Sequence, residues 1–225
     1  MSTAEWSQST RRWLAFPAMV VLVVVGVWIA GGLIADSFRV SMALVTAWFI
    51  LLGVAVFVIA RSRHGLAVPL VAGYLIAAAA VGGFLLLSMR SKTVHEQVVV
   101  GRPASSTAGG GATAAARVEE QTGRFTSGEH ETNGVASVVR LPGGRRMLTL
   151  TRFSTSPGPD VRVRIVPGHT DDGGAKGNVD LGGLKGDKGD QQYELPTGLD
   201  PKGYSVVIWC RAFSAVFGSA FLQPS

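Results

Sequence analysis

The sequence predicts three transmembrane α-helices followed by an all-β extracytoplasmic domain, which is either an antiparallel β-sandwich or a small barrel. Three long apolar runs fill the N-terminal part of the 225-residue chain, whereas the C-terminal half alternates apolar and polar residues with the two-residue period of strands. Apolar residues make up 47% of the chain and charged residues 16%, below the roughly 25% charge of a soluble domain. This composition excludes a soluble cytosolic enzyme and a wholly disordered chain. The single cysteine excludes a disulfide scaffold.

The membrane domain is predicted over residues 1–89, with helices at about 14–35, 40–60 and 66–89. At about 1.5 Å per residue, each run spans roughly the 30 Å of a hydrocarbon core. The first run is too long for the roughly 7–15 apolar residues of a signal peptide. No run contains Asp, Glu, Lys, Arg or His, which favours an anchor over a transporter. Close helix packing is predicted where small residues lie four apart, at Gly26 and Ala30, Gly73 and Ala77, and Ala78 and Gly82.

The basic residues that flank the helices predict the orientation of the chain. Three spans place the two termini on opposite sides of the membrane. The N-terminus and the second loop carry Arg11, Arg12, Arg61 and Arg63, whereas the other side carries Arg39, Arg90 and Lys92. Since cytoplasmic segments are enriched in Lys and Arg, we expect a multi-pass protein of the cell membrane with a cytoplasmic N-terminus and an extracytoplasmic C-terminal domain.

A flexible linker rich in alanine, glycine and serine is predicted over residues 90–121, before the β domain at 122–225. Residues 1–116 carry eight basic and three acidic side chains, and residues 117–225 carry 13 basic and 12 acidic ones. The positive charge therefore belongs to the flanks of the helices, where it meets anionic lipid. Nucleic acid is not an expected partner, because the β domain shows no clustered excess of basic residues.

The β domain is predicted to contain at least five strands and no long helix. The strands are expected at 135–141, 147–153, 160–166, 204–210 and 213–221. The run at 204–210 is the most continuously apolar, so we expect a central strand there. The Gly- and Asp-rich stretches at 171–180 and 186–190 are predicted as surface turns. Their spacing does not match a calcium-binding loop, and no metal site is expected.

Four short blocks in this half of the chain, taken in order, resemble the DM13 domain family over about residues 123–222. The first block holds Gly123, Arg124, Phe125, His130 and Gly134, and the second holds Phe153, Gly158, Pro159, Asp160 and Val161. The third holds Asp180, Leu181, Gly182, Leu184, Lys185, Gly186, Gly189, Gln191, Tyr193, Glu194, Leu195 and Pro196, and the last holds Val207, Ile208, Trp209, Cys210, Phe213, Ser214, Phe217, Gly218 and Ala220. Arg152 stands where the family often has Asn, and Val216 stands where Pro is common.

The resemblance implies a β-rich electron-transfer domain whose signature cysteine, here Cys210, acts in redox chemistry. In that chemistry the cysteine acts as a free thiol or holds a prosthetic group such as haem. The resemblance does not specify which cofactor, if any, is bound. The chain has no Cys-x-x-Cys-His motif, which excludes c-type haem attachment. The candidate ligands are Cys210, His130 and Met147, while His169 lies in a Gly- and Asp-rich loop and is expected to be solvated.

The residues themselves leave three roles open for Cys210: a buried core residue, a redox-active or ligating thiol, and one half of an intermolecular disulfide. Strand alternation places Val206, Ile208 and Cys210 on one face, and Trp209 and Arg211 on the other. A cation beside the sulfur would favour the thiolate, but Arg211 follows on the opposite face.

Two functions are therefore expected. The first is a membrane-anchored extracytoplasmic redox accessory centred on Cys210, with the lipid bilayer and a redox or cell-envelope protein as partners. The second is a non-catalytic binding or interaction module of the cell envelope, in which Cys210 only packs the core. A stand-alone enzyme is not expected, because the chain has no nucleophile elbow, zinc-helix motif or phosphate loop.

Overall fold

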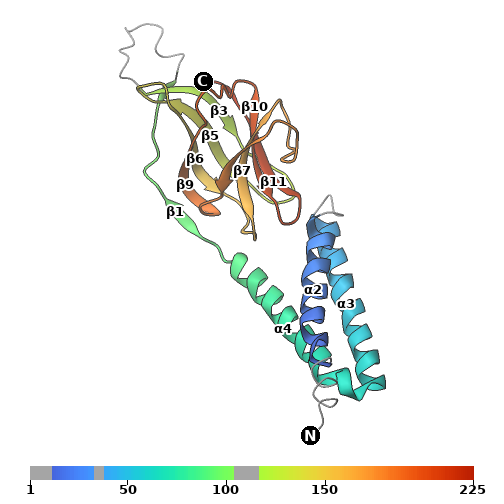
Figure 1. The fold of residues 1–225 in the computed structure, drawn as a ribbon. Helices are drawn as coiled ribbons and strands as arrows, with labels where there is room; N and C mark the ends of the chain where they lie inside the picture. Colours follow the sequence, from blue (N-terminus) through green and yellow to red (C-terminus); the bar gives the residue numbers. More distant parts are fainter. Residues whose placement is uncertain (1–11, 33–37, 104–116) are drawn as a thin grey trace. The chain divides into compact units, whose positions relative to one another are not determined.

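The structure is a computed structural model that describes residues 12–32, 38–103 and 117–225. The chain forms two compact units, residues 1–87 and residues 88–225, and each has its own buried core. The first unit is helical and the second holds the sheets (Figure 1). The prediction of helices followed by a β-rich domain is confirmed in this form.

Three helices make up the described part of the first unit: α2 (Ala15–Gly32), α3 (Phe38–Ser62) and α4 (His64–Ser88). They coincide with the three predicted spans. Among the described residues, α3 and α4 are long and apolar enough to cross a membrane, whereas α2 is apolar but shorter. Residues 33–35 of the first predicted span lie outside the described residues.

Small residues let the helices approach closely, as their spacing predicted. A Cβ atom on Gly26 of α2 would lie 2.0 Å from Nε1 of Trp48 on α3, and one on Gly73 of α4 would lie 3.0 Å from the carbonyl oxygen of Phe16. In contrast, a Cβ atom on Gly82 would meet nothing within 4 Å among the described residues, so the close packing predicted for Ala78 and Gly82 is not seen at Gly82. The packed faces share a core made of Met19, Val23, Leu52, Val56 and Ala77.

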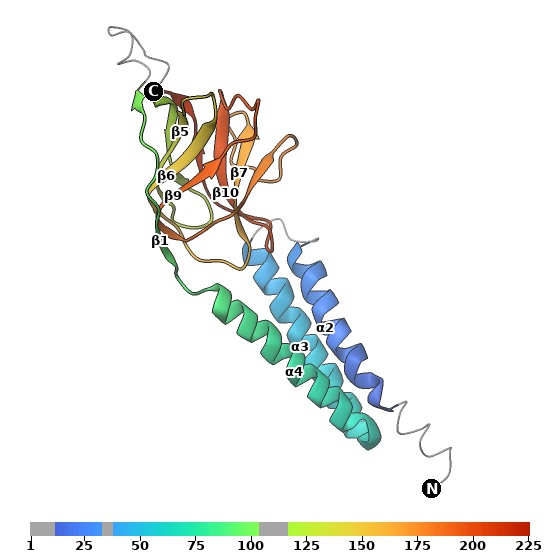
Figure 2. The same ribbon diagram turned by 60° about the vertical axis from the view of Figure 1, so that its left-hand side comes forward.

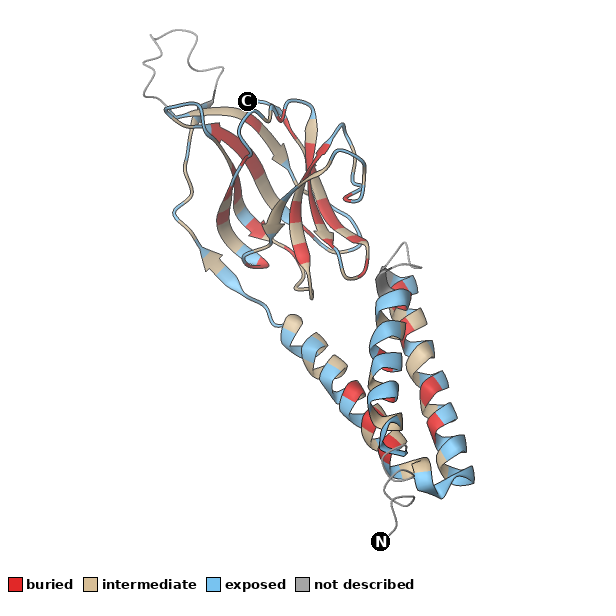
Figure 3. Ribbon diagram, in the orientation of Figure 1, coloured by how far each residue is buried: buried red, intermediate tan, exposed pale blue. Residues whose placement is uncertain are grey.

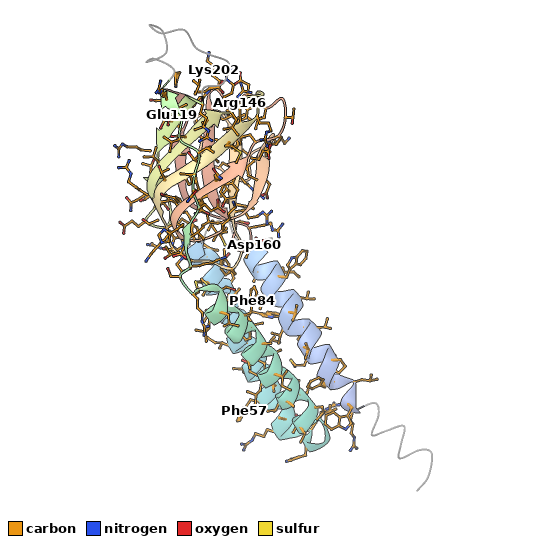
Figure 4. The ribbon with its side chains drawn as sticks, turned by 90° about the vertical axis from the view of Figure 1, so that its left-hand side faces the viewer. Phe57, Phe84, Glu119, Arg146, Asp160 and Lys202 are labelled. Carbon is orange, nitrogen blue, oxygen red and sulfur yellow. The ribbon has the colours of Figure 1, made fainter. Side chains whose placement is uncertain are left out.

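The opposite faces of the helices expose large apolar side chains. Trp28 and Phe57 are each 65% exposed and Leu86 is 75% exposed, and exposed residues run along all three helices in Figure 3. Figure 4 shows Phe57 and Phe84 projecting away from the helix backbones. Contiguous apolar surface of this extent is typical of a membrane or a partner-binding face rather than of a surface in water.

The second unit contains two sheets that lie face to face in Figure 1 and Figure 2. The larger has the order β1-β9-β6-β5-β3-β12, with β2 also paired to β3, and the smaller has the order β4-β11-β10-β7-β8. All pairs are antiparallel except β1 with β9 and β2 with β3. The strands are β1 (Thr93–His95), β2 (Arg102–Pro103), β3 (Val118–Arg124), β4 (Thr126–Ser127), β5 (Asn133–Arg140), β6 (Arg146–Ser154), β7 (Val161–Pro167), β8 (Val179–Gly183), β9 (Lys188–Glu194), β10 (Tyr204–Cys210), β11 (Ala215–Phe221) and β12 (Gln223–Pro224).

The five predicted strands correspond to β5, β6, β7, β10 and β11, and β10 lies centrally between β7 and β11 as expected. The core between the sheets is formed by side chains from both of them, including Leu148, Phe153, Ile165, Ile208 and Phe217. The two stretches predicted as turns, 171–180 and 186–190, overlap the first residues of β8 and β9. Their glycines and charged residues hide the strand pattern, because such residues are depleted in strands.

The segment that follows α4 differs from the flexible linker predicted over 90–121. Its residues 93–95 pair with β9, residues 102–103 pair with β3, and β3 itself begins at Val118. Ser91 Oγ donates a 2.6 Å hydrogen bond to Asp187 Oδ2, and the backbone N–H of Lys92 donates to Asp187 Oδ1. The low-complexity part of the predicted linker, residues 104–116, lies outside the described residues.

Candidate redox site around Cys210

Cys210 is the last residue of β10 and lies between Ala215 of β11 and Val161 of β7. Its sulfur is a free thiol, and the residue is 0% exposed. The continuous apolar run from Val206 to Ile208 holds the strand in the core, because all three of these residues are also 0% exposed. The sulfur therefore has the surroundings of a core residue.

Burial raises the pKa of the Cys210 thiol. The backbone N–H groups of Asp160, Phe213 and Ala212 act in the opposite direction, since they favour the thiolate. The desolvation effect is the larger, so the neutral thiol is the stable form in the closed fold. A deprotonated sulfur would nevertheless find three backbone donors already in place.

The turn at residues 211–214 covers the end of β10. The backbone N–H of Arg211 donates to the carbonyl oxygen of Asp160 at 2.9 Å, and Nε of Arg211 donates to Asp160 Oδ2 at 2.6 Å. Ser214, the last residue of the turn, has a φ of 48°. Both the backbone and the side chain of Arg211 are therefore bound to Asp160. Figure 4 labels Asp160 at one end of the β domain.

Trp209 lies on the outer face of the same sheet, next to Cys210 in sequence but on the other side of the strand. The guanidinium carbon of Arg164 is 3.9 Å from the centre of the Trp209 ring, and Nη1 of Arg164 donates to the carbonyl oxygen of Gly173 at 2.7 Å. A Cβ atom on Gly173 would lie 2.6 Å from the indole. The β7–β8 loop therefore folds over this face, and a glycine is required where it crosses the ring.

The structure does not bring Met147 together with Cys210. Met147 is half-buried at the start of β6, and its neighbour Arg146 donates to the carbonyl oxygen of Leu199, near the start of β10. Cys210 lies six residues along β10 from Tyr204, which is about 20 Å at roughly 3.3 Å per residue. Figure 4 shows Arg146 and Asp160 at opposite ends of the domain.

Neither histidine lies beside Cys210: His130 adjoins β11, and His169 lies beside Ser205, near the other end of β10. The ring of His130 packs on Phe217 with centroids 4.0 Å apart, and the adjacent backbone pairs with the side of β11 that faces away from β10. Burial lowers the pKa of His130, although the Coulombic effect of Glu129 raises it. His169 is exposed, as expected, and stacks on Phe221 at 4.4 Å.

Cys210, His130 and Met147 therefore do not fit a shared haem site. The sulfur is enclosed by protein, His130 is separated from β10 by a whole strand, and Met147 lies at the other end of the sandwich. Within the described residues, no group of three or more His, Cys, Asp or Glu side chains is arranged to hold a metal ion.

Several other residues of the family pattern form a buried hydrogen-bond network beside β9. Gln191 is 0% exposed, and its Nε2 donates to the carbonyl oxygen of Gly186 at 2.9 Å. The backbone N–H of Lys185 donates to both Gln191 Oε1 and the Tyr193 hydroxyl at 3.1 Å. Burial raises the pKa of Tyr193 to about 12. These residues fix the loop between β8 and β9.

Asp180 and Gly182 shape the edge of the smaller sheet. The Gly182 N–H donates to Asp180 Oδ1 at 2.8 Å, and the φ of 110° at Gly182 requires glycine. Burial would raise the pKa of Asp180, but hydrogen bonds from Arg162 and from the Gly182 backbone outweigh it and lower the pKa.

A pocket of about 310 Å³ lies beside this network. Three segments line it: residues 88–92 after α4, residues 156–161 between β6 and β7, and residues 183–187 between β8 and β9. Pro159, Asp160, Leu184, Lys185 and Gly186, all part of the family pattern, are among the lining residues. The contribution of residues 88–92 could not be foreseen from the sequence, which suggested the end of a helix and the start of a tether there.

Comparison with known proteins supports the resemblance for the β domain. No curated protein and no solved structure matches the chain. The region that does match a family contains β5 to β11, the buried thiol at Cys210 and the network around Gln191. Residues 124–222 match the family model described as Electron transfer DM13, which supports an electron-transfer role for this domain.

Proposed function

We propose that this protein is a membrane-anchored electron-transfer accessory, whose β domain lies outside the cytoplasm and whose reactive group is Cys210. The observation that carries the proposal is the match of residues 124–222 to the electron-transfer family, with Cys210 inside the matched region. The partner is a redox or cell-envelope protein that exchanges electrons with the domain. The chain is an accessory and not a stand-alone enzyme.

The helical unit supports anchoring. Both α3 and α4 have the length and apolar character of a membrane span, and neither has an ionised side chain in its middle. Side chains such as Phe57 and Leu86 are more than half exposed, which is stable in lipid and costly in water. The outer side for the β domain is supported by the positive-inside rule, since the N-terminus and the second loop carry more basic residues than the other side.

Reaction at Cys210 requires the 211–214 turn to open. In the closed fold the thiol is neutral and has no contact with solvent, whereas the thiolate is the reactive species. The side-chain contact that holds the turn is the ion pair of Arg211 with Asp160, beside the backbone hydrogen bond between the same residues, and the Arg211 side chain is 58% exposed. Ion pairs with this exposure contribute only about 0.2–1 kcal/mol, so local opening costs less than unfolding the sandwich.

The complete burial of Cys210 favours a second candidate function, a non-catalytic binding module of the cell envelope. A free cysteine that is 0% exposed behaves as a small apolar core residue. In this function the thiol contributes packing only, and the domain surface carries the activity.

The two functions differ in how a thiol reagent reaches Cys210 in the full chain purified in detergent. If the turn is the gate, Arg211→Ala accelerates modification about twofold to fivefold while the free energy of unfolding changes by less than about 1 kcal/mol. The matched control is Val206→Thr, which places a hydroxyl in the same buried strand and lowers the free energy of unfolding by about 1–3 kcal/mol. It should leave the reaction rate unchanged.

The opposite pattern would support the binding module. There the thiol reacts only through global unfolding, so Val206→Thr accelerates the reaction in proportion to the lost stability and Arg211→Ala does not. A redox titration of the same preparations completes the test. A reversible signal that disappears in Cys210→Ser and persists in Val206→Thr supports electron transfer at this sulfur.

A further inference from the structure

We propose that the pocket formed by residues 88–92, 156–161 and 183–187 binds the phosphate group of an anionic phospholipid. This inference rests on the membrane anchoring proposed above. It concerns a site on the second unit that adjoins the Cys210 turn at Asp160, but its cations, Arg90 and Lys92, have no part in the chemistry proposed at Cys210.

The charges in this pocket favour an anion. Its carboxylates are already engaged: Asp160 accepts hydrogen bonds from Arg211 and Arg162, and Asp187 accepts them from Ser91 and the Lys92 backbone. The charge of Asp160 is thus offset by two arginines, whereas the donors to Asp187 are uncharged, so one carboxylate charge remains against the two cations Arg90 and Lys92.

The cations in the pocket are not balanced in the same way. Lys185 is paired with Glu96 at 2.8 Å. Arg90 and Lys92 are exposed, and within the described part of the chain no carboxylate lies within salt-bridge distance of either side chain. Two unpaired cations in a concave site attract a compact anion.

Chain connectivity brings these cations to the height of lipid headgroups. Helix α4 ends at Ser88, so Arg90 and Lys92 follow it by two and four residues. An extended chain covers at most about 3.3–3.6 Å per residue, which limits Arg90 to about 7 Å from the helix end. The polar layer on each side of a bilayer is roughly 5–8 Å thick. When α4 spans the membrane, Arg90 therefore lies within reach of phosphate groups.

The size and lining of the pocket also suit a headgroup. A volume of about 310 Å³ lies at the small end of ligand pockets, which hold roughly 300–1,000 Å³. Gly158, Gly183 and Gly186, which have no side chains, are among the residues that line its wall. Arginine and lysine bind phosphate oxygens by charge-assisted hydrogen bonds.

The test uses the full chain in micelles of an uncharged detergent, titrated by calorimetry. The probes are dihexanoyl phosphatidylglycerol, dihexanoyl phosphatidylcholine and inorganic phosphate. We expect saturable binding of one phosphatidylglycerol per chain and weaker binding of phosphatidylcholine, whose headgroup has no net charge. In Arg90→Gln/Lys92→Gln, the affinity for phosphatidylglycerol should fall on the order of 10-fold to 30-fold.

Two variants serve as controls. Lys176→Gln/Lys202→Gln changes the net charge by the same amount at exposed positions that do not line the pocket, and it should retain binding. Arg90→Lys/Lys92→Arg keeps both charges and should bind nearly as well as the natural chain. An equal loss in the two Gln variants, or equal binding of both lipids, would overturn the proposal.

The source of the phosphate is distinguished by the third probe. Inorganic phosphate that binds as tightly as phosphatidylglycerol, and is lost in Arg90→Gln/Lys92→Gln, would support the anion site and assign it to soluble phosphate. No saturable binding of any probe would overturn the site. Alkaline extraction of cell membranes reports on anchoring separately, because a chain released by carbonate contradicts anchoring whatever the pocket binds.

Discussion

Asp187 is expected to hold the segment after α4 onto the β domain. Its carboxylate accepts hydrogen bonds from Ser91 Oγ and from the Lys92 backbone, although these residues are more than 90 positions apart in sequence. The side chain is only 5% exposed. Asp187→Ala removes both acceptors and leaves a partly buried backbone N–H without its partner.

The size of the effect follows from these contacts. A hydrogen bond to a charged group contributes about 1.5–3 kcal/mol. Ser91 is exposed, and its hydroxyl can bond water once Asp187 is gone, so it adds little. We therefore expect Asp187→Ala to lower the free energy of unfolding of the β domain by about 2–3 kcal/mol. Asp187→Asn keeps an oxygen acceptor and should lose about 1 kcal/mol.

Urea unfolding of the full chain, with the rate of tryptic cleavage after Lys92, measures both consequences. Loss of the Asp187 contacts should speed cleavage, because the segment must leave the sheet to enter a protease. The matched control is Asp171→Ala at an exposed position, which should change the free energy of unfolding by less than about 0.5 kcal/mol. Unchanged cleavage and stability in Asp187→Ala would refute the view that residues 90–103 belong to the domain.

Three further outcomes follow from the structure. Burial raises the pKa of Cys210, so the unfolded chain loses this proton near pH 8.5 while the folded chain keeps it. The associated stability is present below that pH and is lost as the pH rises through the folded pKa. The urea midpoint should fall more between pH 7.5 and 9.5 than in Cys210→Ser, and equal falls would contradict this. Gly26→Val should disrupt the contact of α2 with Trp48, seen as faster proteolysis of the helices, whereas Gly82→Val should not. Impermeant reagents added to intact cells should label a tag at the C-terminus only, and labelling of an N-terminal tag alone would reverse the orientation.

The strands that could be predicted are those in which apolar residues alternate with polar ones or form a continuous apolar run. Residues 161–165 alternate apolar and polar side chains, and residues 204–210 form an apolar run. Both can be recognised as strands without knowing which strands they pair with. In β9 the buried residues are Gln191 and Tyr193, and their polar groups are satisfied by the Lys185 and Gly186 backbones. A buried glutamine gives no apolar signal, so this strand could not be found from periodicity.

The candidate site also has parts that the sequence predicted and parts that it did not. Cys210 was identified through the resemblance, and its burial agrees with the apolar strand that carries it. The position of Arg211 also followed from strand alternation, since it pairs with Asp160 and not with the sulfur. The pocket was not predicted, because it is assembled from three segments that are distant in sequence. Likewise, nothing local to Asp187 or Glu96 indicates that they hold the post-helix segment.

Cys210 is both buried in the core and close to a turn through which it could be reached, two properties that rarely occur together. A thiol enclosed in a β core is protected from oxidation, and burial keeps it protonated. Yet this thiol lies at the end of β10, under a four-residue turn. An ion pair and a backbone hydrogen bond join Arg211 of this turn to Asp160, and the N–H groups of Asp160 and Phe213 lie beside the sulfur. A sulfur in the middle of the strand on the same face, at the position of Ile208, would be reached only by unfolding the sheet. At the strand end, access requires moving one turn, and the donors that favour a thiolate belong to that turn and to the adjoining loop. If Cys210 is the reactive group proposed above, we therefore expect its reactivity to follow the stability of this turn more closely than the stability of the sandwich.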